Sequence, residues 1–269
     1  MYGERHELFA RCLDMEHASG KGKKSVRRES AEVDVVNKRA RHSSAGESSS
    51  EIFRINRMPA FMHPYIEATI DVESDGNCGY RVLALDNKHT EHDFQLIKDD
   101  MLNELKLHRD EYLNIYGGEK RLAYITEALL PSKRKTRRHG VALMEKWFTF
   151  PDMGHVAACI LDRAVVNLTK DRDCLTFFPL RGSPPEDPSS HIVCVGSIPG
   201  HYFHVKLKDG CLIPPTCPQW RNHCSPKAAV RESYFLDRRT KFQELMKAET
   251  GDKKANVAGG STIDDPLVL

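Results

Sequence analysis

The sequence lacks any apolar stretch long enough to span a membrane. The longest wholly apolar run in its 269 residues is Val156 to Leu161, whereas a transmembrane helix needs about 20 apolar residues. The first residues also lack the apolar core of a signal peptide. We therefore expect an intracellular protein, nuclear or cytoplasmic, with no membrane partner.

Cysteine is scarce as well. The chain has eight cysteines in 269 residues, about 3%, whereas disulfide scaffolds have more than about 8–10%. In a reducing compartment we expect these thiols to be free. No Cys-x-x-Cys pair occurs, and the spacing of the one dense group, Cys211, Cys217, His223 and Cys224, fits no common zinc pattern. The sequence therefore predicts neither a metal nor another cofactor.

A charge excess of one sign is also missing. Forty Lys and Arg residues against 38 Asp and Glu residues leave a net charge of +2, so the chain as a whole does not resemble a strongly basic nucleic-acid binder. The basic run Lys133 to Arg138 reads as a solvated loop. We expect no nucleic-acid partner for the domain itself, and a monomer.

Both ends of the chain read as tails. Residues 1–50 are rich in charge and serine and hold two aromatic residues, Tyr2 and Phe9, a composition that cannot bury a core. We expect disordered tails over residues 1–55 and 246–269, and a single domain over residues 56–245. Two basic clusters, Lys23 to Arg28 and Lys38 to Arg41, resemble a bipartite nuclear-import signal; the alternative is a solvated charged linker.

The domain changes character along its length. Apolar residues recur at helical spacing in its first part, which predicts helices over Thr90–Tyr116, Leu122–Leu130, Val141–Phe148 and Met153–Leu161. Short runs rich in β-branched and aromatic residues follow, which predict strands over Ala164–Leu168, Leu175–Pro179, Ile192–Ser197 and Tyr202–Leu207. Helices followed by strands indicate an α+β domain, with a small, mainly antiparallel sheet packed between helices.

The sharpest local feature is the run Asp75-Gly76-Asn77-Cys78-Gly79. Asp-Gly is turn chemistry, and the apolar residues that follow read as a buried helix, so Cys78 is expected at a helix N-terminus. The unpaired N–H groups there favour a thiolate and can form an oxyanion hole. The small Gly76 and Gly79 would let a substrate approach the backbone. The alternative is a tight turn with an inert cysteine.

A cysteine nucleophile needs a base, and the late strand region offers two histidines. His201 follows the turn Pro199-Gly200 and stands at the mouth of a strand. His204 should point to the opposite face, because three steps along a strand reverse the side. A cysteine and a histidine far apart in sequence are the expected arrangement of a cysteine hydrolase.

Together these residues resemble the two signature blocks of the OTU (ovarian tumour) family of cysteine proteases. The first block runs from Asp75 to Arg81, and the second is Gly200-His201-Tyr202. The likeness covers about Ile66 to Phe242. It extends to the plant, transposon-related branch of OTU-like domains through Pro151 to His155 and Leu207 to Pro215.

The resemblance implies a papain-like OTU fold and a deubiquitinase activity. It makes Cys78 the nucleophile, His201 the general base and Asp75 an acidic residue that orients the histidine or stabilises the loop. Backbone N–H groups of Gly76, Asn77 and Cys78 would hold the oxyanion.

The implied substrates are conjugates of ubiquitin or a ubiquitin-like protein, cleaved through a thioester on Cys78. One position departs from the pattern: Phe203 stands two residues after His201, where many family members carry Asp or Asn. This departure keeps an alternative open, a catalytically inactive ubiquitin-binding or scaffold module. A second alternative is a transposon-derived nuclear protein in which the basic N-terminal segment matters most.

Overall fold

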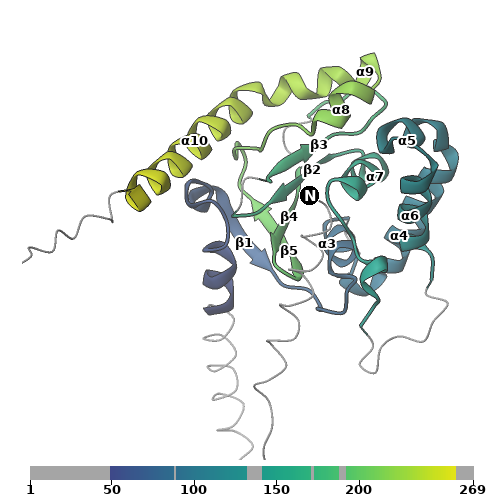
Figure 1. Cartoon of the computed structure of the whole chain (residues 1–269), viewed down its shortest axis with the longest axis horizontal. Helices are drawn as coiled ribbons and strands as arrows, with labels where there is room; N and C mark the ends of the chain where they lie inside the picture. Colours follow the sequence, from purple (N-terminus) through teal and green to yellow (C-terminus); the bar gives the residue numbers. More distant parts are fainter. Residues whose placement is uncertain (1–48, 88, 132–140, 171–172, 188–191, 259–269) are drawn as a thin grey trace, which may run out of the picture.

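The computed structural model describes residues 49–87, 89–131, 141–170, 173–187 and 192–258 (Figure 1). The described part begins with a helical stretch at residues 49–55. The α-helices that follow are α3 (Cys78–Asp86), α4 (Phe94–Leu107), α5 (Arg109–Tyr116), α6 (Glu119–Leu129), α7 (Asp152–Leu161), α8 (Pro218–His223), α9 (Pro226–Ala229) and α10 (Leu236–Ala258). Short 3₁₀ helices lie at η1 (Ala60–Tyr65), η2 (Glu91–Asp93), η3 (Met144–Lys146) and η4 (Val230–Phe235).

A five-stranded sheet forms the centre of the molecule. Its strands are β1 (Ile66–Ile70), β2 (Ala164–Leu168), β3 (Leu175–Phe177), β4 (Ile192–Ile198) and β5 (His201–Leu207), in the order β1-β5-β4-β2-β3. Only β2 and β4 pair in parallel; the other neighbours are antiparallel. The predicted α+β class, with a mainly antiparallel sheet among helices, is confirmed.

Helices cover the sheet and close a continuous apolar core. In Figure 1, α3 and α7 lie between the strands and the group α4, α5 and α6, while α10 runs along the other flank. The strands β2, β4 and β5 are buried over most of their length, and α7 is buried on nearly every side. This burial explains why their sequences read as apolar runs rather than as an alternating pattern.

The helix predicted over Thr90–Tyr116 is divided in two. Thr90 and Asp93 form a capping box before the first helix, and Gly117 ends the second helix in the left-handed conformation, with φ of 70°. Between α4 and α5, His108 leaves the helical conformation, with φ of −120° and ψ of 35°. The periodicity continues across this break because both helices bury their apolar face against the same core.

The helix predicted over Val141–Phe148 is wrong. Only Met144–Lys146 forms a 3₁₀ turn, and Trp147 continues in extended conformation. The backbone N–H of Ala142 donates to the carbonyl of Asp75 at 2.7 Å, so this segment lies against the loop before Cys78. A long-range backbone contact overrides the local helical pattern here.

The structure describes helices on both sides of the expected domain, residues 56–245. Residues 49–55 are helical with Arg54 buried, and α10 continues to Ala258. The sequence analysis also missed β1, which pairs with β5. Both basic clusters of the predicted import signal, and the basic loop Lys133 to Arg138, lie outside the described residues.

Within the described ranges, no helix combines the length and apolar character needed to cross a membrane.

Truncating the fully buried Leu83 of α3 to alanine should lower the free energy of unfolding by about 2–5 kcal/mol, because it removes buried methyl groups and leaves a cavity. Urea unfolding measures this loss. The matched control is Leu107→Ala, since Leu107 is 78% exposed and its truncation should change stability by no more than about 0.5 kcal/mol. Equal losses would contradict the packing of α3 against the sheet.

Candidate active site

Cys78 is the first residue of α3 and is almost fully buried, with 6% exposure. The structure therefore places it at the helix N-terminus, as the sequence predicts. The first backbone N–H groups of a helix have no partner inside the helix, and the positive end of the helix dipole favours an anion there. A sulfur at this position is in suitable surroundings for a nucleophile.

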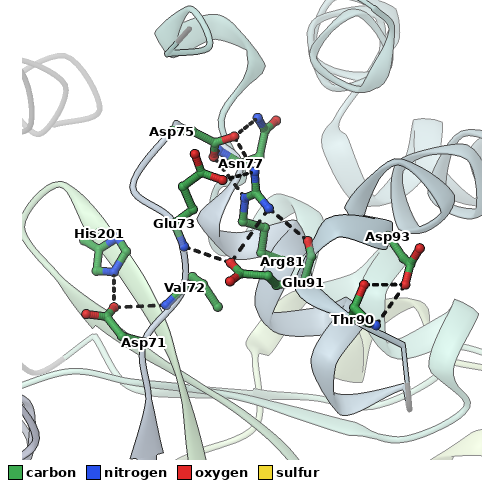
Figure 2. Close-up of polar contacts among 10 residues, drawn as sticks. All are labelled: Asp71, Val72, Glu73, Asp75, Asn77, Arg81, Thr90, Glu91, Asp93 and His201. Carbon is green, nitrogen blue, oxygen red and sulfur yellow. Dashed lines mark hydrogen bonds and ion pairs between the residues drawn. The ribbon is translucent and has the colours of Figure 1, made fainter. Parts of the chain in front are cut away.

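The loop before Cys78 is held by a buried arginine of the same helix (Figure 2). The Arg81 guanidinium donates to both carboxylate oxygens of Asp75, at 2.8 and 3.2 Å, and to Glu73 at 2.8 Å. It also donates to the backbone carbonyl of Glu91 at 3.1 Å. Only 5% of the Arg81 side chain is exposed, so water competes weakly for these bonds. Arg81 thus fixes the path of the chain into the nucleophile.

Asp75 shapes this loop rather than orienting the histidine. Besides Arg81, its carboxylate accepts from the backbone N–H of Asn77 at 2.8 Å and from the Asn77 side chain at 3.0 Å. Burial raises the pKa of Asp75, but the hydrogen bonds from Arg81 and Asn77 outweigh it and hold the pKa below the ordinary value of 3.8. Of the two roles that the family resemblance offers for Asp75, the structure shows the loop-stabilising one.

His201 meets a different carboxylate, that of Asp71. Its Nε2 lies 2.7 Å from Oδ1 of Asp71, and its Nδ1 lies 2.8 Å from Oγ of Ser74. Cys78 lies near enough to act on the imidazole electrostatically. One ring nitrogen of His201 therefore meets a carboxylate and the other a hydroxyl group, beside the thiol.

This environment favours the charged form of His201. Burial alone would lower its pKa, but the hydrogen bonds and charges of Asp71 and Cys78 outweigh burial and raise the pKa from 6.5 to about 9. Burial acts against ionisation of Asp71 too, yet His201 and Arg54 keep its pKa below 3.8. An ionised Asp71 beside an imidazolium is the arrangement that stabilises a thiolate–imidazolium pair.

The register between β1 and β5 explains why the carboxylate of Asp71 lies beside His201. The last residue of β1, Ile70, pairs with His204 of β5. Continuing this antiparallel register by one residue places Asp71 opposite Phe203, the position where the family pattern has Asp or Asn. The sequence analysis missed Asp71 because it missed β1; the run Ile66–Ile70 before the Cys78 loop was the available signal.

His204 has a separate partner, as expected from the alternation along a strand. Its Nε2 lies 3.1 Å from Oδ1 of Asp86 at the end of α3, and the ring is buried. Asp86 also binds Arg163 at 2.8 Å. His204 thus belongs to a hydrogen-bonded network between α3 and the sheet, separate from the contacts of His201.

The two glycines of the motif make room for aromatic side chains. A Cβ on Gly76 would lie 2.5 Å from Nε1 of Trp147, and one on Gly79 would lie 2.4 Å from Cβ of Phe148. Gly76 also has a positive φ of 85°, which L-residues rarely adopt. Trp147 and Phe148 are both buried. Packing therefore accounts for both glycines, and the approach of a substrate to their backbone stays a prediction.

The expected oxyanion donors are not equivalent. The backbone N–H of Asn77 already donates to Asp75, whereas Cys78 presents its N–H at the first position of α3. The Asn77 side chain has a further partner, since Nζ of Lys98 donates to Oδ1 of Asn77 at 3.3 Å. Burial and the charge of Lys146 lower the pKa of Lys98 to about 8. The structure thus favours Cys78 over Asn77 as a donor to an oxyanion, and the role of the Gly76 N–H stays a prediction.

A second cysteine–histidine pair shows what the environment contributes. Sγ of Cys217 lies 3.5 Å from Nε2 of His155, and both residues are almost fully buried. Here burial dominates: it lowers the pKa of His155 to about 4 and raises that of Cys217. This pair is therefore neutral at pH 7, in contrast to the pair that Asp71 supports.

The cysteine cluster near the C-terminal part holds no grouped metal ligands. Cys211 contacts Arg238, whereas Cys217 contacts His155 and Gln219. Among the residues that the structure describes, no three His, Cys, Asp or Glu side chains gather as a metal site.

Replacing Arg81 by methionine should lower the free energy of unfolding by about 3 kcal/mol, since it leaves the Asp75 carboxylate, which is only 16% exposed, without its arginine partner. Asp75 has a depressed pKa in the folded state, so its contribution is present above pH 3.8 and is lost as the pH falls below that value. The difference between wild type and Arg81→Met should therefore shrink below about pH 4. Thermal unfolding at several pH values measures it.

Arg109→Met is the matched control for Arg81→Met. Arg109 pairs with Glu119 at the surface, where 49% and 65% of the two side chains are exposed, and exposed pairs contribute under about 1 kcal/mol. A loss for Arg81→Met no larger than that for Arg109→Met would show that the buried contacts do not hold the loop.

Comparison with known proteins finds no matching family model and no matching curated protein. Among solved structures, the crystal structure of the viral OTU domain protease from Farallon virus is similar. The alignment covers 55% of this chain and 87% of the viral chain, with 18% sequence identity and a TM-score of 0.35.

Proposed function

We propose that the chain is an OTU-type cysteine isopeptidase that cleaves conjugates of ubiquitin or a ubiquitin-like protein. One observation carries the chemical part of this proposal: His201 lies between Cys78 and Asp71, with a pKa raised to about 9. The substrate class rests on the resemblance of the Asp75–Arg81 and Gly200–Tyr202 blocks to that family.

The geometry supports a thiol mechanism with defined roles. His201 takes the proton of Cys78 through Nδ1, and Asp71 holds the imidazolium through Nε2. The thiolate attacks the carbonyl carbon of the scissile amide, and backbone N–H groups at the start of α3 receive the oxyanion. His201 then protonates the leaving amine, and water activated by His201 hydrolyses the thioester.

The inactive alternative was suggested by Phe203. A fully buried phenyl ring cannot accept a hydrogen bond from His201, but the carboxylate of Asp71 reaches the same imidazole from the neighbouring strand. The observation that favoured an inactive module therefore has a structural compensation, and we propose an active enzyme.

We also propose, from the sequence alone, a place in the plant, transposon-related branch and a nuclear or cytoplasmic location. Part of each block of that branch lies in the core: His155 packs against Phe177 at 5.1 Å between ring centroids, and Thr176 donates to the carbonyl of Pro214 at 2.8 Å.

Ubiquitin carrying an electrophilic group at its C-terminus should form a covalent adduct with the wild-type chain and none with Cys78→Ala. Intact-protein mass spectrometry detects the adduct. Cys217→Ala is the matched control, because Cys217 is also buried beside a histidine but in a neutral pair, and it should retain the adduct. A folded wild type that forms no adduct with ubiquitin or a ubiquitin-like probe would contradict the enzyme proposal.

The two histidines of β5 refine this test. His201→Ala should slow adduct formation by about 10²–10⁴-fold, the range for loss of a general base, whereas His204→Ala should act mainly on stability through Asp86. Equal slowing by both variants would remove His201 as the base.

A further inference from the structure

The orientation of the partly exposed Asp71 carboxylate depends on its hydrogen-bond partners. Its side chain is 54% exposed, and a freely rotating carboxylate would hold His201 only part of the time. Oδ1 accepts from His201 at 2.7 Å and from the backbone N–H of Val72 at 3.0 Å. The other oxygen, Oδ2, accepts from Arg54 at 3.0 Å. Each oxygen thus has its own partner, which fixes the plane of the carboxylate.

Arg54 is itself held in one place. Its side chain is only 10% exposed, and Nε donates to Oγ1 of Thr69 on β1 at 3.1 Å. The backbone N–H of Thr69 in turn donates to Glu51 at 3.0 Å. Two side chains of the helical stretch 49–55 therefore attach it to the strand that leads to Asp71.

Phe203 completes this support. The Arg54 guanidinium lies over the Phe203 ring, 6.0 Å from its centroid, a contact that favours a cation. The ring is fully buried and packs on Gly196 of β4, where a Cβ would lie only 2.4 Å away. Phe203, the residue that departs from the family pattern, thus packs against Arg54, and Arg54 in turn binds Asp71.

We propose that Arg54 is a positioning residue for His201, acting through Asp71, and that residues 49–55 are part of the catalytic unit. The inference rests on the proposed function only in naming the reaction that His201 serves. Arg54 touches neither Cys78 nor the reacting atoms. It acts by keeping Asp71 ionised and oriented, so that His201 stays protonated beside Cys78 at neutral pH.

Alkylation of Cys78 by iodoacetamide tests this directly on the full chain and needs no ubiquitin. Mass spectrometry of the peptide that contains Cys78 gives the rate from pH 5.5 to 10. Arg54→Met, which keeps an apolar stem, should slow the reaction about tenfold at pH 6.5, the change that one unit in the pKa of His201 carries. Near pH 10, above the pKa of about 9 of His201, the imidazole is mostly neutral, so the variant and wild type should react alike.

Matched variants separate positioning from folding. Arg57→Met is the control, because Arg57 is exposed on the same segment, with its guanidinium 5.0 Å from the Phe53 ring centroid; its profile should equal that of wild type. Arg54→Lys keeps the charge but loses the planar fork and should lie between wild type and Arg54→Met. Asp71→Asn should slow the reaction at pH 6.5 at least as much as Arg54→Met.

Three results would overturn the proposal. An Arg54→Met profile equal to that of Arg57→Met would show that Asp71 needs no anchor. A uniform slowing at every pH would indicate altered access to Cys78 rather than a change at His201. A faster reaction of Arg54→Met at pH 6.5 would mean that the positive charge of Arg54 weakens the electrostatic effect of Asp71 on His201 instead of supporting it. Failure of the ubiquitin probe, with the alkylation difference intact, would contradict the proposed substrate and leave the role of Arg54 standing.

Discussion

The antiparallel pairing of β1 with β5 is the constraint on which the site depends. β5 begins at His201, and β1 leads through a short loop to Cys78, so this pairing brings both residues to one edge of the sheet. It also fixes Asp71 beside His201. A slip of two residues in the register would move Asp71 by about 7 Å along the strand, out of reach of the imidazole. The helical stretch 49–55, attached to β1 through Thr69, supports the same register from the outside.

Electrostatics then distinguishes two cysteine–histidine pairs of the same chemistry. Sγ of Cys217 lies close to Nε2 of His155, and burial leaves both side chains neutral. His201 is less deeply buried, and its Nε2 meets the carboxylate of Asp71. A neighbouring cysteine therefore does not set the charge of a histidine, whereas the carboxylate on the second ring nitrogen of His201 favours its protonated form.

The sequence was informative where the signal is local. The turn Asp75-Gly76 before an apolar run located Cys78 at a helix N-terminus, and Pro199-Gly200 located His201 at the start of a strand. The central strands and α7 were also predictable, because buried strands and helices leave continuous apolar runs in the sequence. By contrast, the segment Val141–Phe148 has a helical pattern that its contact with the Cys78 loop overrides.

Asp71, Arg54 and Arg81 were out of reach for the opposite reason. Each is a charged residue in a sequence rich in charge, and only its partner distinguishes it. Asp71 and Arg54 depend on a strand register, and the role of Arg81 depends on burying a guanidinium among three acidic residues. The carboxylate nearest to Cys78 in sequence, Asp75, suggested an orienting role, yet the carboxylate nearest to His201 in space is that of Asp71.

The protonation of His201 is the property from which the proposed chemistry follows, and NMR titration of its imidazole in the full chain measures it directly. The structure predicts a pKa of about 9 in the wild type and a clear fall toward the ordinary value of about 6.5 in Asp71→Asn. A wild-type pKa at or below 6.5, or a value that Asp71→Asn leaves unchanged, would contradict the account of Asp71 as the acid that sustains the Cys78–His201 pair.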